Sequence, residues 1–501
     1  MQSIDHRMKN FTISLYAFHL RNSLTDSLEE VATEAKNLWE NLAELGKASL
    51  PLPELKNLRS HLICYDENDE YNYTRERDLP SEWLTKTGYS LDLGGFDTES
   101  GFKIRGNLQP FLLQNTYFAD LTLFPETPDI EIQPSQLQEF YCQNLLPTAI
   151  RNVPLNKIPI IWLLLQKIDC MAGILFIRKL FNSFLGQTIW IYGETDKPDD
   201  ICESLAKSYA VSLLEGSKFA GNLRLVNQGQ LFGSLLFEYE AADPEDLLNL
   251  AKKCHILVWI NNKQSSTLEL AETAYNWMRD LLWSRHKMIY VYQQSRNLYG
   301  RCRKISRELK KEIKEFFPID SPDKNQQEQL SNLLQDLPEN RLEYSDYLRD
   351  LKLQLTGFKT NAENYQICLN KIDEIGNGKE SEVWQNFLNF VPRWQKQIEI
   401  DLEYLEPGKE LFDRAIETAN ITGILQAQRT RSLEKTIKAF GVGLSVTGIF
   451  TACYLKYADV PFVWPTWKLN TIHPLVRSIF SIALFAAFVI PFIRWYVNRK
   501  D

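Results

Sequence analysis

The sequence lacks the residue pairs from which most zinc sites and disulfide frameworks are built. Its 8 cysteines and 6 histidines are scattered singly along 501 residues, and no CxxC, HxxxH or HExxH occurs. A metal site or a disulfide framework needs such residues at short, regular spacings. We therefore expect reduced thiols, no metal and no cofactor.

Glycine-rich phosphate loops and a secretory signal are also missing. The turn after the strand-like run 188–192 is GETD, which is neither GxGxxG nor GxxxxGK[ST]. Residues 1–11 are polar and charged, unlike a cleaved leader. Because no nucleophile–base pair stands out either, the sequence predicts a protein that is not an enzyme.

An excess of positive charge is absent as well. The chain has 56 Lys and Arg against 64 Asp and Glu, a formal net charge of -8 and a pI of about 5.6. Such a balance repels a phosphate backbone, so we expect no direct nucleic-acid binding.

The sequence does contain a pattern of strands and helices in two regions. We interpret residues 1–155 as an α+β region and residues 156–295 as an α/β domain. Periodicity in the first region predicts a helix at 26–48 and strands at 11–19, 61–65, 102–105 and 117–124. In the second region it predicts strands at 188–192, 223–226, 231–239 and 256–260, and helices at 199–214, 244–253 and 267–283. Alternation of this kind predicts an α/β sheet covered by helices, and we interpret the charged residues of the second region as solvent-facing.

The apolar run 158–177 has two interpretations, a membrane span or a part of the core. Lys167 and Asp169 lie near its middle, and each would cost about 2.5–3.5 kcal/mol at the centre of a bilayer. We interpret the run as a core helix or a pair of strands.

A bundle of long helices is predicted at 296–436. One helix has an apolar stripe from Leu298 to Phe316 and an opposite face rich in Lys and Arg. Either this basic face packs against later acidic helices or faces water, or it binds an anionic nucleotide. The candidate ligand-binding residues are Arg301, Arg303, Lys304 and Arg307.

The last region, 437–501, contains two apolar runs at 439–455 and about 477–497. Each is long enough for a transmembrane helix, and we expect a stalk helix that starts at Pro407 to continue into the first. Lys and Arg are more frequent before the first run and after the second than between them. The positive-inside rule then predicts a multi-pass protein of the inner (plasma) membrane with both termini in the cytoplasm.

This order of parts resembles the CorA-type metal-ion transporter superfamily, whose members are homopentameric channels lined by the first span. The resemblance is direct for roughly the last 90 residues and is one of plan for the rest. The Gly-Met-Asn signature of the family is absent: an ungapped match places Leu455-Lys456-Tyr457 at its position, after the aromatic Tyr454. Divergent CorA-like proteins include antiviral membrane effectors associated with type III CRISPR systems, which respond to a nucleotide.

The resemblance implies a pore along one face of the first span. Helical spacing gives as pore-lining candidates Thr436, Phe440, Gly443, Thr447 and Thr451, with Lys456 at the outer mouth. A neighbouring face of small residues, which includes Gly441 and Ser445, could exchange roles with it. A ring of Lys456 would repel divalent cations.

The sequence thus predicts a cytoplasmic α/β domain, a long α-helical stalk and a two-helix transmembrane hairpin, in a CorA-like arrangement. The predicted function is a channel or transporter in the lipid bilayer, with a cytoplasmic part that senses a ligand. From the resemblance, we expect it to assemble as a homopentamer. The alternatives are a membrane-anchored sensor or scaffold that conducts nothing, and an ordinary divalent cation transporter.

Overall fold

The computed structural model describes residues 7–429, apart from 23–30, 33, 49, 77–78, 80, 141–182, 245–252, 263, 317–323 and 379. The chain divides into two compact units. The first consists of Met1–Glu308 with Leu342–Lys409, and the second of Leu309–Arg341 with Glu410–Asp501.

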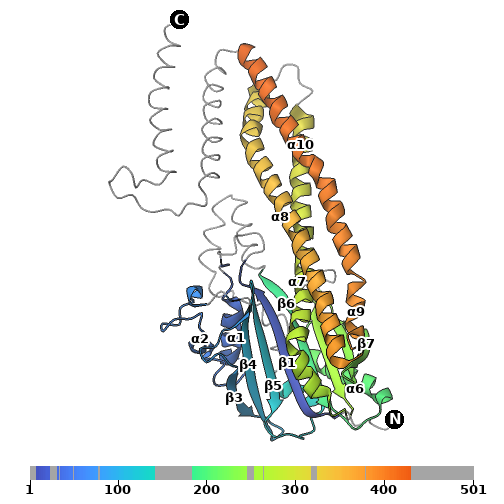
Figure 1. The fold of residues 1–501 in the computed structure, drawn as a ribbon. Coiled ribbons are helices and arrows are strands. Elements are labelled where there is room, and N and C mark those ends of the chain that lie inside the picture. The colour runs from blue at the N-terminus through green and yellow to red at the C-terminus, as the bar shows by residue number, and fades with distance from the viewer. Residues whose placement is uncertain are drawn as a thin grey trace. The chain divides into compact units, whose positions relative to one another are not determined.

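One mixed sheet of nine strands forms the centre of the first unit, in the order β2-β4-β5-β1-β6-β9-β8-β7, with β3 also paired to β4 (Figure 1). The strands are β1 (Lys9–Leu20), β2 (Ser81–Trp83), β3 (Leu91–Asp97), β4 (Lys103–Leu113), β5 (Thr116–Pro125), β6 (Phe184–Glu194), β7 (Leu223–Leu231), β8 (Ser234–Ala241) and β9 (Cys254–Asn261). β1 is antiparallel to both β5 and β6, and β6 is parallel to β9. Strands from the predicted α+β region and from the predicted α/β domain therefore lie in a single sheet.

Period-two alternation gives the sheet two different faces. In β1, Ile13, Leu15 and Ala17 belong to the large apolar core, whereas Tyr16 and Phe18 point to the opposite face. The alternation of β5, β6 and β9 follows the same rule, because their core residues are also spaced by two.

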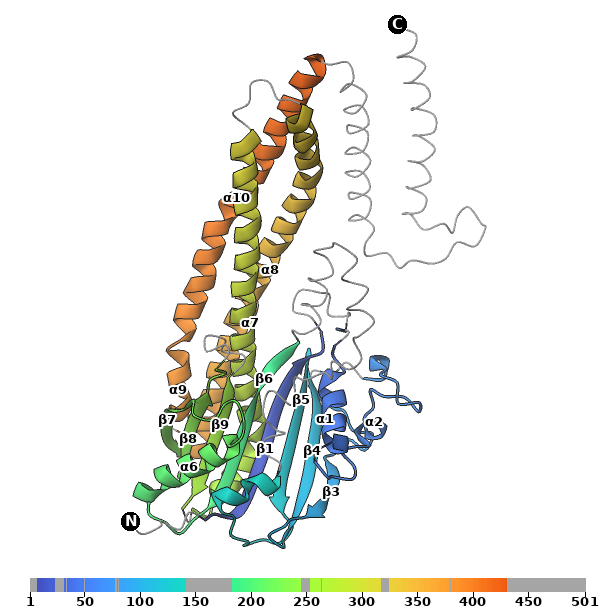
Figure 2. The same cartoon turned by 180° about the vertical axis from the view of Figure 1, so that it is seen from behind.

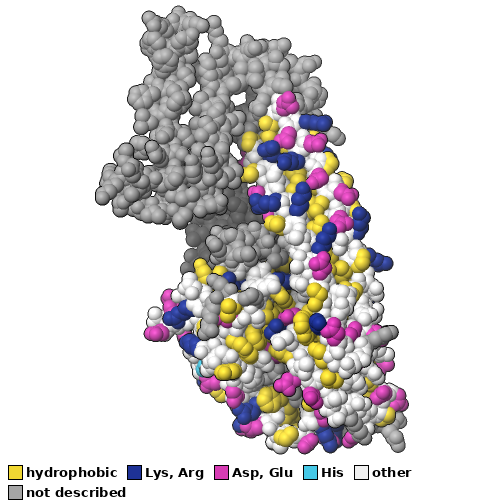
Figure 3. Space-filling view, in the orientation of Figure 1, with side chains coloured by type: hydrophobic (Ala, Val, Ile, Leu, Met, Phe, Trp, Pro, Cys, Tyr) yellow, Lys and Arg dark blue, Asp and Glu magenta, His cyan; other side chains and the backbone are white. Residues whose placement is uncertain are grey.

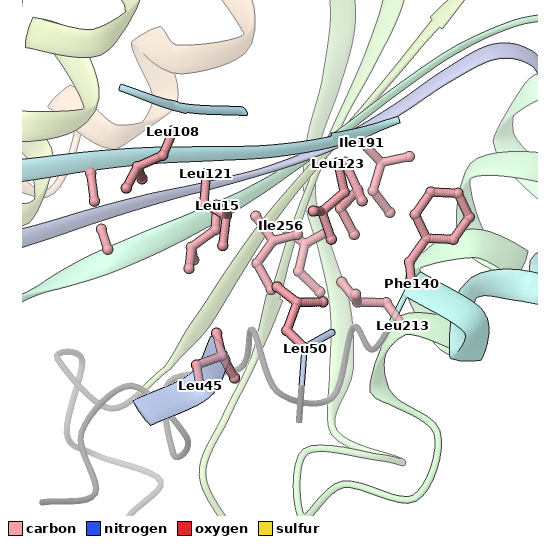
Figure 4. Close-up of a cluster of buried hydrophobic side chains, with 14 of the residues drawn as sticks. Leu15, Leu45, Leu50, Leu108, Leu121, Leu123, Phe140, Ile191, Leu213 and Ile256 are labelled. Atoms are coloured by element: carbon pink, nitrogen blue, oxygen red, sulfur yellow. The ribbon is translucent and has the colours of Figure 1, made fainter. Parts of the chain in front are cut away.

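The apolar face is covered by short helices (Figure 2). These are α1 (Asn37–Ala48), α2 (Leu58–His61), the 3-10 helix η2 (Pro134–Phe140) and α6 (Asp199–Leu214). Figure 4 shows Leu45, Phe140 and Leu213 on the same side of the sheet as Leu15 and Ile256, in one cluster of buried side chains. Each such side chain contributes about 1.5–3 kcal/mol when fully buried, so this face contributes much of the hydrophobic stabilisation.

The opposite face is covered mainly by α7 (Thr267–Phe316). The short helix α9 (Glu382–Leu388) also packs there, with Trp384 at 6.2 Å from Trp190 of β6 between ring centroids. The apolar α7 residues Met278, Leu282 and Met288 are buried, and Tyr275 packs edge-on against Tyr16 of β1 at 6.4 Å between ring centroids. The whole α7 helix is 50 residues long and uninterrupted, and its later part continues beyond the sheet.

Three further helices follow, α8 (Lys324–Gly376), α9 (Glu382–Leu388) and α10 (Val391–Arg429). In α8, apolar residues recur at alternating steps of four and three residues, which is the seven-residue repeat of helices packed lengthwise. These residues are Tyr344, Leu348, Leu351, Leu355, Phe358, Ala362, Tyr365, Leu369 and Ile372. Most of these side chains are buried. Lys359 of α8 pairs with Glu399 of α10 at 3.1 Å, and Arg296 of α7 pairs with Asp401 of α10.

Several local predictions differ from the structure. Residues 61–65, predicted as a strand, form only isolated bridges after α2. The predicted strand 231–239 is interrupted by a tight hairpin turn, because Phe232 and Gly233 both have positive φ, 52° and 77°. Pro407 lies inside α10 instead of starting a helix, and the carbonyl of Leu405 there accepts a hydrogen bond from the Tyr344 hydroxyl at 2.6 Å.

The predicted fold class needs a correction. Among the residues that the structure describes, no helix combines the length and the apolar composition that crossing a membrane requires. The long helices α7, α8 and α10 have charged residues throughout, and Figure 3 shows acidic and basic side chains interspersed on the face in view. The described architecture is an α/β fold with a mixed sheet and long helices.

The same finding overturns the prediction of a multi-pass inner-membrane protein with both termini in the cytoplasm. The two predicted spans, 439–455 and 477–497, lie outside the described residues. So do the apolar run 158–177 and all of the pore-lining candidates, Thr436, Phe440, Gly443, Thr447, Thr451 and Lys456.

Candidate functional site

A buried polar network lies between the sheet and α7. Three neighbouring strands contribute to it: β6 places Thr188 beside His255 of β9, and β8 places Glu240 on the other side of His255. Glu238 lies two residues before Glu240, so alternation turns both carboxylates to the same face. From α7, the consecutive residues Arg285 and His286 reach this face.

A continuous chain of hydrogen bonds connects four of these side chains. Glu238 Oε1 lies 2.9 Å from His255 Nε2, and His255 Nδ1 lies 2.8 Å from Thr188 Oγ1. Thr188 Oγ1 in turn lies 2.9 Å from His286 Nε2. All four side chains are at most 5% exposed, so water does not compete for these bonds.

An ion-pair cluster adjoins the Glu238 end of this chain. Arg285 donates to Glu240 at 2.8 Å and lies 3.7 Å from Glu238. Lys253 donates to Glu240 at 2.7 Å. The guanidinium of Arg285 also lies over the Phe387 ring, 5.1 Å from its centroid. Arg285 is 3% exposed, and a charge this deeply buried is stable only with such partners.

The two carboxylates have opposite pKa shifts. Burial raises the pKa of Glu238 to about 7, although Arg285 acts against this shift. Burial also acts to raise the pKa of Glu240, but Arg285 and Lys253 outweigh it and lower the pKa to about 2. Burial holds the pKa of His255 well below its usual value, so the ring is neutral at pH 7. Near neutral pH, Glu240 is ionised and Glu238 is near the midpoint of its titration.

Two more polar contacts join α7 to the sheet. Asp120 of β5 accepts a hydrogen bond from Tyr275 at 2.7 Å, and burial raises the pKa of Asp120 to about 6. Lys287 donates to Asn115 at 2.7 Å, and burial lowers the pKa of Lys287 to about 7. Groups that titrate near neutrality are therefore spread along the length of the contact.

A separate buried cluster holds the 64–76 segment against the sheet. Arg21 donates to Glu76 at 2.5 Å, Glu76 also accepts from Tyr117, and the hydroxyls of Tyr117 and Tyr71 lie 2.7 Å apart. Burial raises the pKa of Glu76. These groups are mutually satisfied, which is typical of a structural ion pair.

In the described part of the chain, no group of three His, Cys, Asp or Glu residues could hold a metal ion. The network contains two histidines and two carboxylates, yet its nitrogens and oxygens are directed at Thr188, Arg285 and Lys253. What this arrangement can do is move protons and redistribute charge beneath α7.

The predicted ligand-binding residues lie elsewhere on α7. Arg301 is half-buried over the Tyr347 ring, at 5.7 Å from its centroid. Arg303, Lys304 and Arg307 are exposed, and Lys304 lies 3.9 Å from Glu308. These three side chains form an exposed stripe, which no element in the described part of the chain encloses.

The network itself was missed in the sequence, where the charged residues of 156–295 were interpreted as solvent-facing. Glu238 and Arg285 are buried instead, and Glu240 is partly buried. The sequence held no signal for this burial, because Glu238 and Glu240 at every second position of β8 are the usual pattern of a solvent-facing strand side.

Comparisons with protein-family models and with curated proteins found no match for this chain. The resemblance to the CorA-type superfamily therefore stays a prediction.

Proposed function

We propose that this protein is a sensor in which changes at the contact between the sheet and α7 alter the packing of the long helices. The observation that carries the proposal is the continuity of α7. Its first part is fixed to the sheet through buried groups that titrate near neutral pH, and the same helix packs against α8 and α10 further along.

Contacts beyond the sheet give the signal a physical path within the first unit. Tyr292 of α7 stacks on Trp394 at 5.1 Å between centroids, Arg296 pairs with Asp401, and Arg301 lies over Tyr347. A small shift or rotation of α7 must change these contacts, because packed side chains have discrete arrangements.

An anionic small molecule, such as a nucleotide, is the ligand class that we propose for this sensor. Its support is the exposed basic stripe of Arg303, Lys304 and Arg307, which follows the contacts just described on the same helix. Phosphate groups favour such clusters of donors.

Hydrogen exchange tests the proposed path. Glu240→Gln removes the negative charge that pairs with Arg285 and so weakens the contact between the sheet and α7. We therefore expect faster hydrogen exchange in residues 292–305 of α7, which lie beyond the sheet. Ile256→Ala is the matched control, because Ile256 is buried next to His255 but faces the apolar core. The proposal is wrong if both variants speed exchange in residues 292–305 equally, once each effect is divided by that variant's loss of unfolding free energy.

A scaffold that assembles through α8 is a second candidate. Leu342, Leu353 and Ile367 are exposed by 64%, 43% and 50%, and at about 3.6 residues per turn they share one stripe of the helix. Exposed apolar stripes favour self-association, in line with the predicted homopentamer. Sedimentation should then show an oligomer that Leu353→Glu with Ile367→Glu dissociates, whereas Tyr89→Glu, at an exposed hydrophobic residue outside α8, does not. A wild-type monomer at all concentrations would contradict this candidate.

A further inference from the structure

We infer that Glu238, His255, Thr188 and His286 form a proton relay with two hydrogen-bond polarities that reverse together when the cluster loses one proton. The inference deepens the proposed sensor function and rests on it only for the consequence to α7. The geometry of the relay stands on the three consecutive hydrogen bonds of 2.8–2.9 Å.

In the first polarity, the relay holds one proton more. Protonated Glu238 donates to His255 Nε2, and His255 Nδ1–H donates to the Thr188 oxygen. The Thr188 hydroxyl hydrogen is then directed at His286 Nε2, and His286 carries its own hydrogen on Nδ1. Every link has one donor and one acceptor, as neutral imidazoles and a hydroxyl require.

In the second polarity, every bridging hydrogen has moved by one link. The Glu238 proton passes to His255 Nε2, the His255 Nδ1 hydrogen passes to Thr188, and the Thr188 hydrogen passes to His286 Nε2. The hydrogen on His286 Nδ1 leaves the cluster to solvent from His286, which at 5% exposed is the least buried of the four side chains. The cluster has then lost one proton, and Glu238 has become a carboxylate. No electron transfer and no other reactant is needed.

Intermediate patterns are costly, which makes the reversal cooperative. If one link reversed alone, two hydrogens or two lone pairs would face each other in a buried site. Each such mismatch costs about 1–3 kcal/mol, and the four side chains are too buried for water to relieve it.

The charged groups around the relay determine its consequence. Arg285 of α7 faces Glu238 and Glu240 of β8, Lys253 next to β9 faces Glu240, and Tyr365 of α8 lies near Glu238. When Glu238 becomes negative, Arg285 gains a second carboxylate partner and is drawn from Glu240 towards Glu238. A proton lost at His286 is thus converted into a shift of charge beneath α7.

The backbone fixes the other end of the relay. His286 packs against Phe18 of β1, at 5.5 Å between ring centroids, and against Gly186 of β6. Gly186 has φ +150° and leaves room only because it has no Cβ; Nδ1 of His286 lies nearest to where a Cβ would be. The ring is therefore held with Nε2 towards Thr188 and cannot flip without displacing this strand.

Nitrogen NMR of the full chain labelled at histidine tests the inference, since only 6 histidines contribute signals. In the wild type, we expect the hydrogen of each ring, His255 and His286, to be on Nδ1 at low pH and on Nε2 at high pH. Both rings should change with one common midpoint between pH 5 and 8.5. Thr188→Ser keeps the hydroxyl and should preserve the common midpoint. Thr188→Val removes it, and the two rings should then lose their shared transition.

Two results would overturn the relay: tautomers that do not change in the wild type, or a common midpoint that survives in Thr188→Val. If Thr188→Val does not fold, Glu238→Gln decides, because its amide cannot lose the proton and both tautomers should stay fixed across the range. The exchange experiment on Glu240→Gln reports on the helices alone, so a failed relay and a failed sensor proposal are distinguishable.

Discussion

The two faces of the sheet use the same strands for different purposes. One face meets α1, α6 and η2 through Leu, Ile and Phe side chains, and the other meets α7 through Thr188, His255 and Asp120 together with aromatic rings. The energy of an apolar contact changes gradually with small displacements, because it follows the buried area. A buried polar contact is either satisfied or costly, so the α7 face is suited to switching and the apolar face to holding the fold.

Removing one charge from the α7 face should have the largest effect. Arg285→Met keeps the packing on Phe387 but leaves Glu240 with only Lys253, and we expect about 3–5 kcal/mol loss of unfolding free energy. Chemical denaturation at pH 7 measures it. The double variant Arg285→Met with Glu240→Gln should recover at least half of the loss, and no recovery would show that the ion pair is not the cause.

The second largest effect should be on the pH dependence of the unfolding free energy, which we expect to come from the α7 face and not from the apolar face. The pKa of Glu238 is raised to about 7 from 4.5, so its stabilising contribution is full below about pH 4.5 and is lost as the pH rises through 7. The corresponding change is about 3 kcal/mol. Glu238→Gln should remove this part of the decline between pH 4.5 and 7, and a smaller decline should remain from Asp120, whose pKa is raised to about 6.

Leu15→Ala, on the apolar face, is the control for that profile. Leu15 is fully buried, and its truncation should cost about 2–5 kcal/mol by the same amount at every pH. A decline that is as steep in Glu238→Gln as in the wild type, or one that disappears in Leu15→Ala, would contradict the assignment of this titration to Glu238 on the α7 face.

Gly186→Ala should have an intermediate effect that reaches both faces. The added methyl group meets the His286 ring, and φ of +150° is unfavourable for alanine. We expect a loss of about 1–3 kcal/mol, measured by thermal unfolding. Gly88→Ala is the matched control: Gly88 also has positive φ, +75°, but open space around it. An equal loss in both variants would indicate backbone strain without a role for His286.

The sequence allowed the sheet to be predicted in part, and the α7 face hardly at all. β1, β5, β6 and β9 alternate or are strongly apolar, and each contains a predicted strand. β3 was missed because its LDLGGFD segment has two glycines in the middle, which weakens strand propensity. The hairpin between β7 and β8 was missed because a bulky Phe232 occupies a turn position that normally selects glycine or asparagine.

The polar network depends on pairings that no local pattern contains. Thr188 lies 67 residues before His255 and 98 before His286, and only the strand order brings them together. A glutamate at every second position, as in β8, is the usual mark of a solvent-facing strand side. The network could be recognised only once α7 was known to cover that side.

The smallest effect is expected from ion pairs at the surface of the helices, which sharpen the comparison from outside the sheet. Lys359 and Glu399 lie 3.1 Å apart, nearly the distance between Arg285 and Glu240, but the Lys359 side chain is 45% exposed against 4% for Arg285. Water and salt screen the exposed pair, and holding two long side chains in place costs entropy. Lys359→Gln should therefore change the unfolding free energy by less than about 1 kcal/mol, and 1 M salt, where the Debye length is about 3 Å, should remove the difference from the wild type. Chemical denaturation at low and high salt measures both. A loss as large as that of Arg285→Met would mean that burial does not distinguish the two pairs, and the contrast between the α7 face and the rest of the chain would fail.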